Sequence, residues 1–220
     1  MQSDGLIIPP QAGEVMALIE RYLHPAPLLV IISGPSGVGK DSVVRRMREL
    51  AYPFHFVVTA TDRPRRPAEV NGIDYHFLST AEFERMIAAD EFLEYARVYG
   101  QYKGVPKAQA RQALASGMDV IMRLDVQGTA TVRQKVPQAL TIFLVPPSLE
   151  VLIHRLRQRG TESAEELQRR LEMALAELRC AGAFDYVVVN HEGALDQTAA
   201  RIMAIIQAEK CRVARQAVQL

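Results

Sequence analysis

The chain has 220 residues, with 26 Lys and Arg against 25 Asp and Glu, a net charge of +1, and 49% hydrophobic residues. This length and composition predict one globular domain with a sizeable core and exclude a disordered chain. The near-neutral balance argues against a nucleic-acid partner. There is no apolar run long enough for a membrane span, and the first residues lack the features of a signal peptide. Two cysteines, Cys180 and Cys211, are too few for a disulfide framework or a zinc site, so we expect a cytoplasmic protein.

The spacing of apolar residues predicts strands that alternate with helices. Residues 1–27 read as an N-terminal appendage, in which Glu14–Leu23 has helical spacing. The expected strands are Leu28–Ser33, Phe54–Ala60, Tyr75–Leu78, Asp119–Val126, Leu140–Val145 and Tyr186–Asn190. The expected helices are Asp41–Leu50, Ala81–Ala89, Lys107–Ser116, Leu149–Arg159, Glu165–Cys180 and Leu195–Cys211. This alternation predicts an α/β fold, with a mostly parallel sheet covered by helices on both faces.

A glycine-rich motif lies between the first buried strand and the helix that follows it. The segment fits the phosphate-binding pattern G-x-x-x-x-G-K. In this motif backbone N–H groups surround phosphate oxygens, the helix N-terminus adds its positive dipole end, and the lysine reaches the β- and γ-phosphates. We therefore expect a nucleoside triphosphate on Gly34, Pro35, Ser36, Gly37, Val38, Gly39 and Lys40.

The residue after this lysine departs from the pattern. A Ser or Thr that binds Mg²⁺ is usual there, whereas this chain has Asp41, followed by Ser42. A carboxylate is a good oxygen ligand for Mg²⁺, so we expect Asp41 to take the metal role directly or through water. Its negative charge is also expected to weaken nucleotide binding when the metal is absent.

A second candidate phosphate-binding segment is the proline-containing loop of residues 61–67, which holds Arg63, Arg65 and Arg66. Guanidinium groups bind phosphate through paired N–H donors, so the loop suits a second anionic substrate. An arginine-rich loop is by itself more often a solvated surface. Its interpretation therefore depends on the neighbouring motifs.

The motifs together resemble those of the guanylate kinase family, and they occur in order from about residue 28 to about residue 210. They are GPSGVGK at 34–40, R-x-x-R-x-x-E-x-x-G-x-D-Y-x-F at 63–77, EFLE at 91–94, LDVQG at 124–128, PPS at 146–148, RGTE at 159–162 and DYVVVN at 185–190. The resemblance implies a P-loop parallel-sheet core over residues 28–215, with a small nucleotide-binding α+β insertion at 59–106 and a helical lid at 150–172. It leaves only the N-terminal appendage uncovered.

The resemblance also implies an activity. Guanylate kinases transfer the γ-phosphoryl group of ATP to GMP, giving ADP and GDP, with Mg²⁺. The implied partners are ATP and GMP or dGMP, with neither nucleic acid nor membrane, and the chain would be a monomer or a homodimer.

Site residues follow from the same resemblance. Arg63 and Arg66 match arginines that hold the GMP phosphate, and Tyr75 matches a hydroxyl donor to it. Glu94 matches the carboxylate that accepts from guanine N1–H and the 2-amino group. The complete implied GMP site is Thr59, Arg63, Arg66, Tyr75, Glu94 and Asp125.

On the ATP side, Asn190 matches a residue beside the adenine, and the lid arginines match those that stabilise charge on the transferred phosphoryl group. The implied catalytic residues are Lys40, Arg155, Arg159 and Arg170. The implied metal residues are Asp41, Ser42 and Asp125.

The chain departs from the family pattern at three further positions. Val105 stands where a Ser or Thr usually contacts guanine O6, and Lys103 replaces a family tyrosine. Arg123 stands where a second acidic residue is usual, so it could pair with Asp125 or bring a different acceptor phosphate. Thr59 retains the hydroxyl expected near the base.

Two alternatives stay open at this point. The Lys40-Asp41-Ser42 and Gly104-Val105 segments also look like those of ribose 1,5-bisphosphate phosphokinases. The complete arginine segment, Glu94 and Asp125 speak against a sugar site. The other alternative is a non-catalytic domain that binds phosphorylated proteins, against which the intact G-x-x-x-x-G-K motif speaks.

Overall fold

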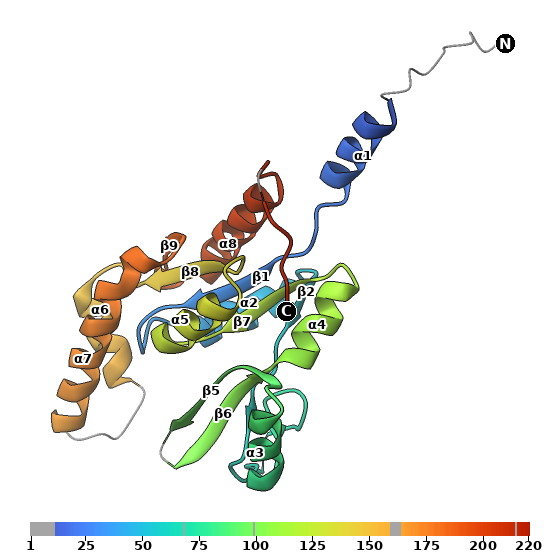
Figure 1. Ribbon diagram of the computed structural model, residues 1–220. Helices are drawn as coiled ribbons and strands as arrows, with labels where there is room; N and C mark the ends of the chain where they lie inside the picture. The colour runs from blue at the N-terminus through green and yellow to red at the C-terminus, as the bar shows by residue number, and fades with distance from the viewer. Residues whose placement is uncertain (1–11, 68, 99, 159–163, 214) are drawn as a thin grey trace.

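The computed structural model describes residues 12–67, 69–98, 100–158, 164–213 and 215–220. At its centre lies a five-stranded parallel sheet in the order β2-β7-β1-β8-β9 (Figure 1). The strands are β1 (Leu29–Ser33), β2 (Phe54–Phe56), β7 (Asp119–Arg123), β8 (Leu140–Val145) and β9 (Tyr186–Val189). Parallel strands need long crossover connections, and helices supply them here, so the predicted α/β fold is confirmed.

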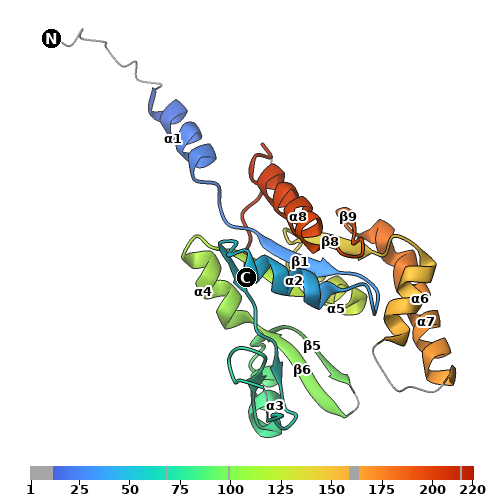
Figure 2. The same cartoon turned by 180° about the vertical axis from the view of Figure 1, so that it is seen from behind.

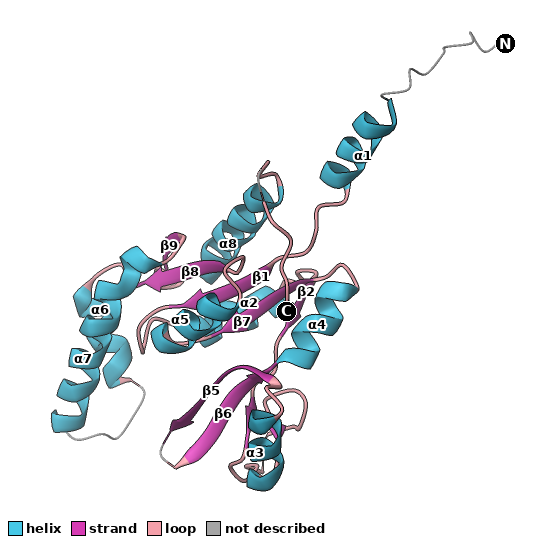
Figure 3. Ribbon diagram, viewed as in Figure 1, coloured by secondary structure: helices cyan, strands magenta, loops and turns pink. Residues whose placement is uncertain are grey.

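Strand β1 shows why both faces of this sheet are covered. Its alternate residues point to opposite faces: Val30 and Ile32 belong to one buried cluster, and Leu29 and Ile31 to another. The first cluster includes side chains of α2 (Lys40–Glu49) and α8 (Leu195–Lys210). The second includes side chains of α4 (Lys107–Ala115) and α5 (Val126–Lys135), so the sheet lies between two helical layers (Figure 3).

A smaller sheet lies beside the core, in the order β4-β3-β6-β5. Its elements are β3 (Ala60–Thr61), β4 (His76–Phe77), α3 (Thr80–Ala88), β5 (Phe92–Val98) and β6 (Gln101–Pro106). The Phe83 ring of α3 stacks between Phe92 and Tyr102, with centroid distances of 4.3 and 5.1 Å. These aromatic contacts hold α3 against the sheet.

Two helices extend from the carboxyl end of the core strands (Figures 1 and 2). They are α6 (Leu149–Arg157) and α7 (Ala164–Leu178), and the short helix η1 (Arg179–Ala183) follows. Leu152 and Leu156 of α6 pack with Ala174 of α7. The predicted helix Leu149–Arg159 thus ends at Arg157, and residues 159–163 lie outside the described residues.

Helix α1 (Ala12–Leu23) confirms the helical spacing of the N-terminal appendage, yet none of its residues is buried. It projects away from the body of the molecule (Figures 1 and 2). Within the described part of the chain, no helix has the length and apolar character needed to cross a membrane.

The sequence prediction was wrong at two strands. The expected strand Phe54–Ala60 is two strands, because the chain leaves the core sheet after Phe56 and enters the small sheet at Ala60. The expected strand Asp119–Val126 ends at Arg123, because Asp125 caps the next helix, α5. Strands β5 and β6 and helix α5 were not predicted.

Candidate active site

The glycine-rich loop of residues 34–40 joins β1 to α2, and its first and last glycines show why glycine is needed there. Gly34 and Gly39 have φ values of 143° and 97°, which favour glycine. A Cβ on Gly34 would lie 2.5 Å from the Leu144 carbonyl oxygen, and a Cβ on Gly39 would lie 2.8 Å from Asn190 Nδ2. The loop therefore fits closely against β8 and the end of β9, with its last glycine at the N-terminus of α2.

Lys40 is the last residue of the loop and the first of α2, and its side chain turns back over the loop. Its Nζ donates to the carbonyl oxygens of Gly34 and Pro35, the second at 3.2 Å. The side chain is half-buried and lies against the segment that the motif assigns to phosphates. The predicted contact of Lys40 with the β- and γ-phosphates stays a prediction.

The side chains of Asn190 and Arg155 hold the loop in place through hydrogen bonds to its backbone. Asn190 is 2% exposed; its Nδ2 donates to the Val38 carbonyl at 2.8 Å, and its Oδ1 accepts from Thr198 Oγ1 at 3.0 Å. Arg155 donates to the carbonyl oxygens of Val38 and Asn190, both at 3.2 Å. The side-chain amide of Asn190 therefore positions the loop, and its predicted contact with the adenine stays a prediction.

Helix α7 also contacts the loop. The Ser36 backbone N–H donates to Glu177 Oε2 at 2.9 Å, a contact between residues 141 positions apart that no local sequence signal indicated. Of the two remaining lid arginines, Arg170 is a half-buried residue of α7 and Arg159 lies outside the described residues. Residues of α6 and α7 thus reach the phosphate loop directly.

A cavity of about 220 Å³, here called the central cavity, lies between the loop and the small sheet. It gathers six predicted site residues from separate parts of the chain: Lys40, Asp41, Thr59, Tyr75, Glu94 and Asp125. The three positions that depart from the family pattern also line it, namely Lys103, Val105 and Arg123. Both the predicted contacts and the departures therefore meet in one site.

Glu94 reaches this cavity because strand β5 contains a bulge. The pairing with β6 shifts between Phe92 and Glu94, so that Leu93 is the extra residue. Phe92 and Leu93 are both buried, in different clusters, and Glu94 is directed to the cavity. Burial, and then the negative charge of Asp125, raise the pKa of Glu94 to about 7.

Asp125 is the N-cap of α5 rather than the last residue of a strand. Its Oδ1 accepts from the Gly128 N–H at 2.7 Å, which satisfies one of the free donors at the helix start. A Cβ on Gly128 would lie 3.2 Å from both Asp125 Oδ1 and Glu94 Cδ. Gly128 therefore allows the two carboxylates to approach each other, which the sequence did not indicate.

Asp41 is paired with Arg123. Arg123 Nη1 donates to Asp41 Oδ1, so its partner is the residue after the P-loop lysine and not Asp125, which was one of the two alternatives considered. The cause is the register of the sheet, in which Arg123 lies opposite Ile32, close to the start of the loop. Ser42 is half-buried on α2 and does not line the central cavity.

The arginine loop adjoins this cavity without lining it. Arg63 donates to Glu69 through both terminal nitrogens. Its guanidinium carbon Cζ lies over the Tyr75 ring, 4.9 Å from the ring centroid. Glu69 also accepts from the Arg66 backbone N–H at 2.9 Å, and these partners lower the pKa of Glu69 to about 2. The Arg66 side chain is exposed. Glu69 therefore positions Arg63, a role that sequence reasoning missed although Glu69 stood in the motif.

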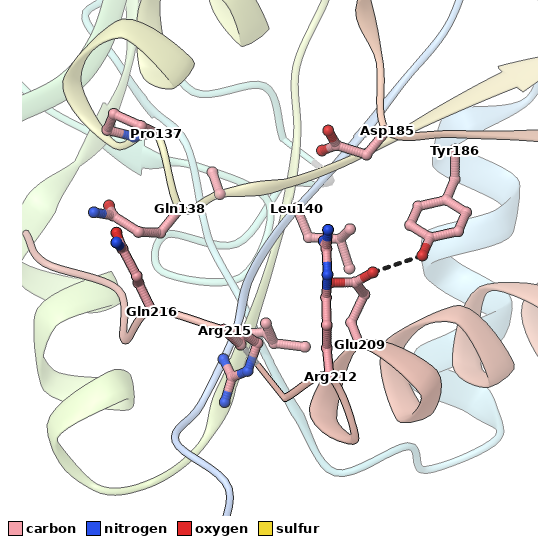
Figure 4. A pocket seen from close by; sticks show the side chains of 11 residues that line it. Pro137, Gln138, Leu140, Asp185, Tyr186, Glu209, Arg212, Arg215 and Gln216 are labelled. Atoms are coloured by element: carbon pink, nitrogen blue, oxygen red, sulfur yellow. Dashed lines mark hydrogen bonds and ion pairs between the residues drawn. The ribbon is translucent and has the colours of Figure 1, made fainter.

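A larger cavity, of about 770 Å³, lies at the opposite, amino-terminal end of the core strands (Figure 4). Two of its carboxylates already have hydrogen-bond partners: Glu209 accepts from the Tyr186 hydroxyl at 2.6 Å, and Asp185 accepts at 2.8 Å from Arg133, which does not line the cavity. None of the predicted site residues lines it. The central cavity is therefore the candidate active site.

The comparisons with known proteins agree with this geometry. Residues 27–209 match the family model described as Guanylate kinase. This chain belongs to the guanylate kinase family. It is 48% identical over 197 residues to guanylate kinase 2, chloroplastic/mitochondrial, of Oryza sativa subsp. japonica, covering 89% of this chain and 69% of the relative. It is 44% identical to the guanylate kinase of Symbiobacterium thermophilum, covering 87% and 90% of the two chains.

A solved structure confirms the fold. The crystal structure of guanylate kinase from Anaplasma phagocytophilum superimposes with a TM-score of 0.68 at 29% sequence identity, covering 87% of this chain and 90% of that chain. The expected family, the P-loop α/β fold and the classification as a kinase are thus confirmed.

Proposed function

We propose that this guanylate kinase family enzyme transfers the γ-phosphoryl group of ATP to GMP, giving ADP and GDP. The observation that carries the proposal is the central cavity, which is lined both by Lys40 of the phosphate loop and by Tyr75 and Glu94 of the acceptor side. One cavity thus combines Lys40, which the motif assigns to a triphosphate, with the half-buried carboxylate of Glu94, which can accept hydrogen bonds from the N–H groups of a nucleobase such as guanine.

On the acceptor side, Glu94 accepts from guanine N1–H and the 2-amino group, and Thr59 lies within reach of the same cavity. Tyr75 donates its hydroxyl to the GMP phosphate. Arg63, held by Glu69 and by the Tyr75 ring, supplies guanidinium donors beside it, and Arg66 supplies a further cation. Residues 59–106, which contain the small sheet, form the GMP-binding insertion.

On the donor side, residues 34–42 bind the ATP phosphates and Asn190 lies near the adenine. Lys40, Arg155, Arg159 and Arg170 stabilise the charge that develops on the transferred phosphoryl group. Residues 150–172 form a lid. Its contacts with the loop, through Arg155, support closure that excludes water from the reaction.

The residues of the cavity fit Mg²⁺. This ion prefers hard oxygen ligands and usually takes one or two carboxylates together with substrate phosphates and water. Asp41 and Asp125 line the cavity beside Lys40, and Asp41 is exposed enough to reach a ligand, with Ser42 next to it on α2. Bound there, Mg²⁺ would neutralise charge on the β- and γ-phosphate oxygens of ATP.

Compartment and assembly stay predictions. Cys180 and Cys211 are free thiols, which supports a reducing compartment such as the cytoplasm. A monomer and a homodimer are both compatible with this fold.

Parallel kinase assays test the proposal. ATP consumption is measured with GMP, dGMP, AMP, UMP and ribose 1,5-bisphosphate, each with and without Mg²⁺. We expect a preference for GMP and dGMP that requires the metal. A preference for any other acceptor would overturn the substrate assignment, and ATP-independent binding of phosphopeptides without turnover would overturn catalysis.

A further inference from the structure

An ion pair in the central cavity joins Asp41 and Arg123, two charged residues that depart from the family pattern. Arg123 ends β7, and Asp41 is the second residue of α2, 82 residues earlier in the chain. The parallel pairing of β7 with β1 places Arg123 opposite Ile32, one residue before the end of β1. The carboxyl end of β7 thus brings a guanidinium group to the residue beside Lys40.

The pair does little for the stability of the fold. The Arg123 and Asp41 side chains are 36% and 64% exposed, and ion pairs exposed to this degree contribute little because water screens them. Its consequence is local. Asp41 places a negative charge beside a triphosphate site, and Arg123 offsets that charge.

Arg123 is also in position to bind phosphate. It lines the same cavity as Lys40 on the donor side and Tyr75 on the acceptor side. Negative charge accumulates between donor and acceptor during phosphoryl transfer, and a guanidinium group binds phosphate oxygens through paired N–H donors. In the structure, its Nη1 donates to Asp41 Oδ1.

We propose that Arg123 exchanges partners: it holds the Asp41 carboxylate in the nucleotide-free protein and binds phosphate oxygens once Asp41 is engaged by the metal. Arg123 is then a further catalytic residue, and Asp41 controls when it becomes available. This inference rests on the proposed phosphotransferase function of the same site.

The decisive test is a double-mutant cycle without metal. Isothermal titration calorimetry in EDTA measures the affinity of the full chain for an ATP analogue with an imido bridge between the β- and γ-phosphates. We expect Asp41→Asn to tighten binding by about ten-fold, because it removes a repulsive charge and frees Arg123 for the phosphates. In an Arg123→Gln background, the same substitution should give a distinctly smaller gain, because only the repulsion is removed. An equal or larger gain in that background would overturn the exchange.

A second measurement tests the catalytic part with Mg²⁺ present. At saturating ATP and GMP, Arg123→Gln should lower kcat by about 100-fold, as expected when one donor to the developing charge is removed. Arg123→Lys, which keeps the charge without the paired donors, should recover part of this loss. An unchanged kcat in Arg123→Gln would refute the catalytic role.

The control variant is Arg45→Gln on the same helix as Asp41. Arg45 is 71% exposed and forms a comparable surface pair with Glu49 at 3.8 Å, away from the cavity. We expect it to change neither the metal-free affinity nor kcat, and all variants should keep the wild-type melting temperature because both pairs are exposed. Should GMP prove not to be the acceptor, the metal-free cycle still reports on the exchange, so failure of the two proposals is distinguishable.

Discussion

Glu94 provides the sharpest prediction, because its pKa of about 7 lies within the range in which enzymes are assayed. Burial raises this pKa from the ordinary value of 4.5, and the nearby Asp125 adds to the effect. In the proposed site guanine donates hydrogen bonds to Glu94, so we expect GMP to bind the ionised carboxylate. The Kd for GMP should therefore be nearly constant above pH 8 and rise about ten-fold between pH 8 and pH 6.

Glu94→Gln separates this effect from the titration of GMP itself, whose phosphate has a second pKa near 6. The variant should bind GMP about 10- to 100-fold more weakly at pH 8, because an amide replaces a charged acceptor. Between pH 8 and pH 6 it should show only the phosphate titration. Fluorescence or calorimetric titrations of both proteins across this range measure the difference. Identical pH profiles would refute the assignment of Glu94 to the base.

The raised pKa of Glu94 also predicts how the stability of the folded protein depends on pH. A carboxyl group whose pKa is raised by folding destabilises the folded state when ionised, above about pH 7, and has no such effect below about pH 4.5. The difference between 4.5 and about 7 corresponds to about 3 kcal/mol, which solvent screening of this half-buried side chain reduces to about 1–2 kcal/mol. Urea denaturation should therefore show Glu94→Gln to be more stable than wild type at pH 8 but not at pH 4.5.

Three further predictions concern the surroundings of the cavity. Glu69→Gln should raise the KM for GMP several-fold with little change in the KM for ATP, because Glu69 positions Arg63; equal changes in both would contradict this role. Asn190→Ala should lower the unfolding free energy by about 1–2 kcal/mol in urea denaturation and weaken ATP binding, because the Val38 carbonyl and the Thr198 hydroxyl each lose their shortest hydrogen bond and keep only longer ones, to Arg155 and to the Ala194 carbonyl. Removal of residues 1–23 should change neither the urea midpoint nor kcat, since no residue of α1 is buried; a lower midpoint would show that the helix supports the core.

Local signals in the sequence were sufficient for the first core strand and the phosphate loop. The run Leu28–Ser33 predicted a strand buried on both faces, and β1 is fully buried. The glycines of the loop were recognised because the spacing G-x-x-x-x-G-K has a backbone cause, seen in the positive φ of Gly34 and Gly39. Both signals depend on residues adjacent in the chain.

The small sheet was harder to predict because its strands have no simple alternation. In β5 the bulge places Phe92 and Leu93 in two different clusters, so two adjacent apolar residues are both buried and the period of two is lost. Helix α5 is likewise rich in Thr, Val and Gly, which are weak helix formers, and it depends on the Asp125 cap for its start. In both cases tertiary contacts decide the local structure.

The pairing of Asp41 with Arg123 could not be predicted from the sequence, for a different reason. Each residue was recognised as a departure from its motif, but the motif positions do not reveal which strand lies beside the phosphate loop. That neighbour is set by the strand order β2-β7-β1, which places the last residue of β7 next to the start of α2. A negative charge after Lys40 is thus accompanied by a positive charge from the neighbouring strand. The two substitutions are therefore best understood as one change in the charge arrangement around the phosphates.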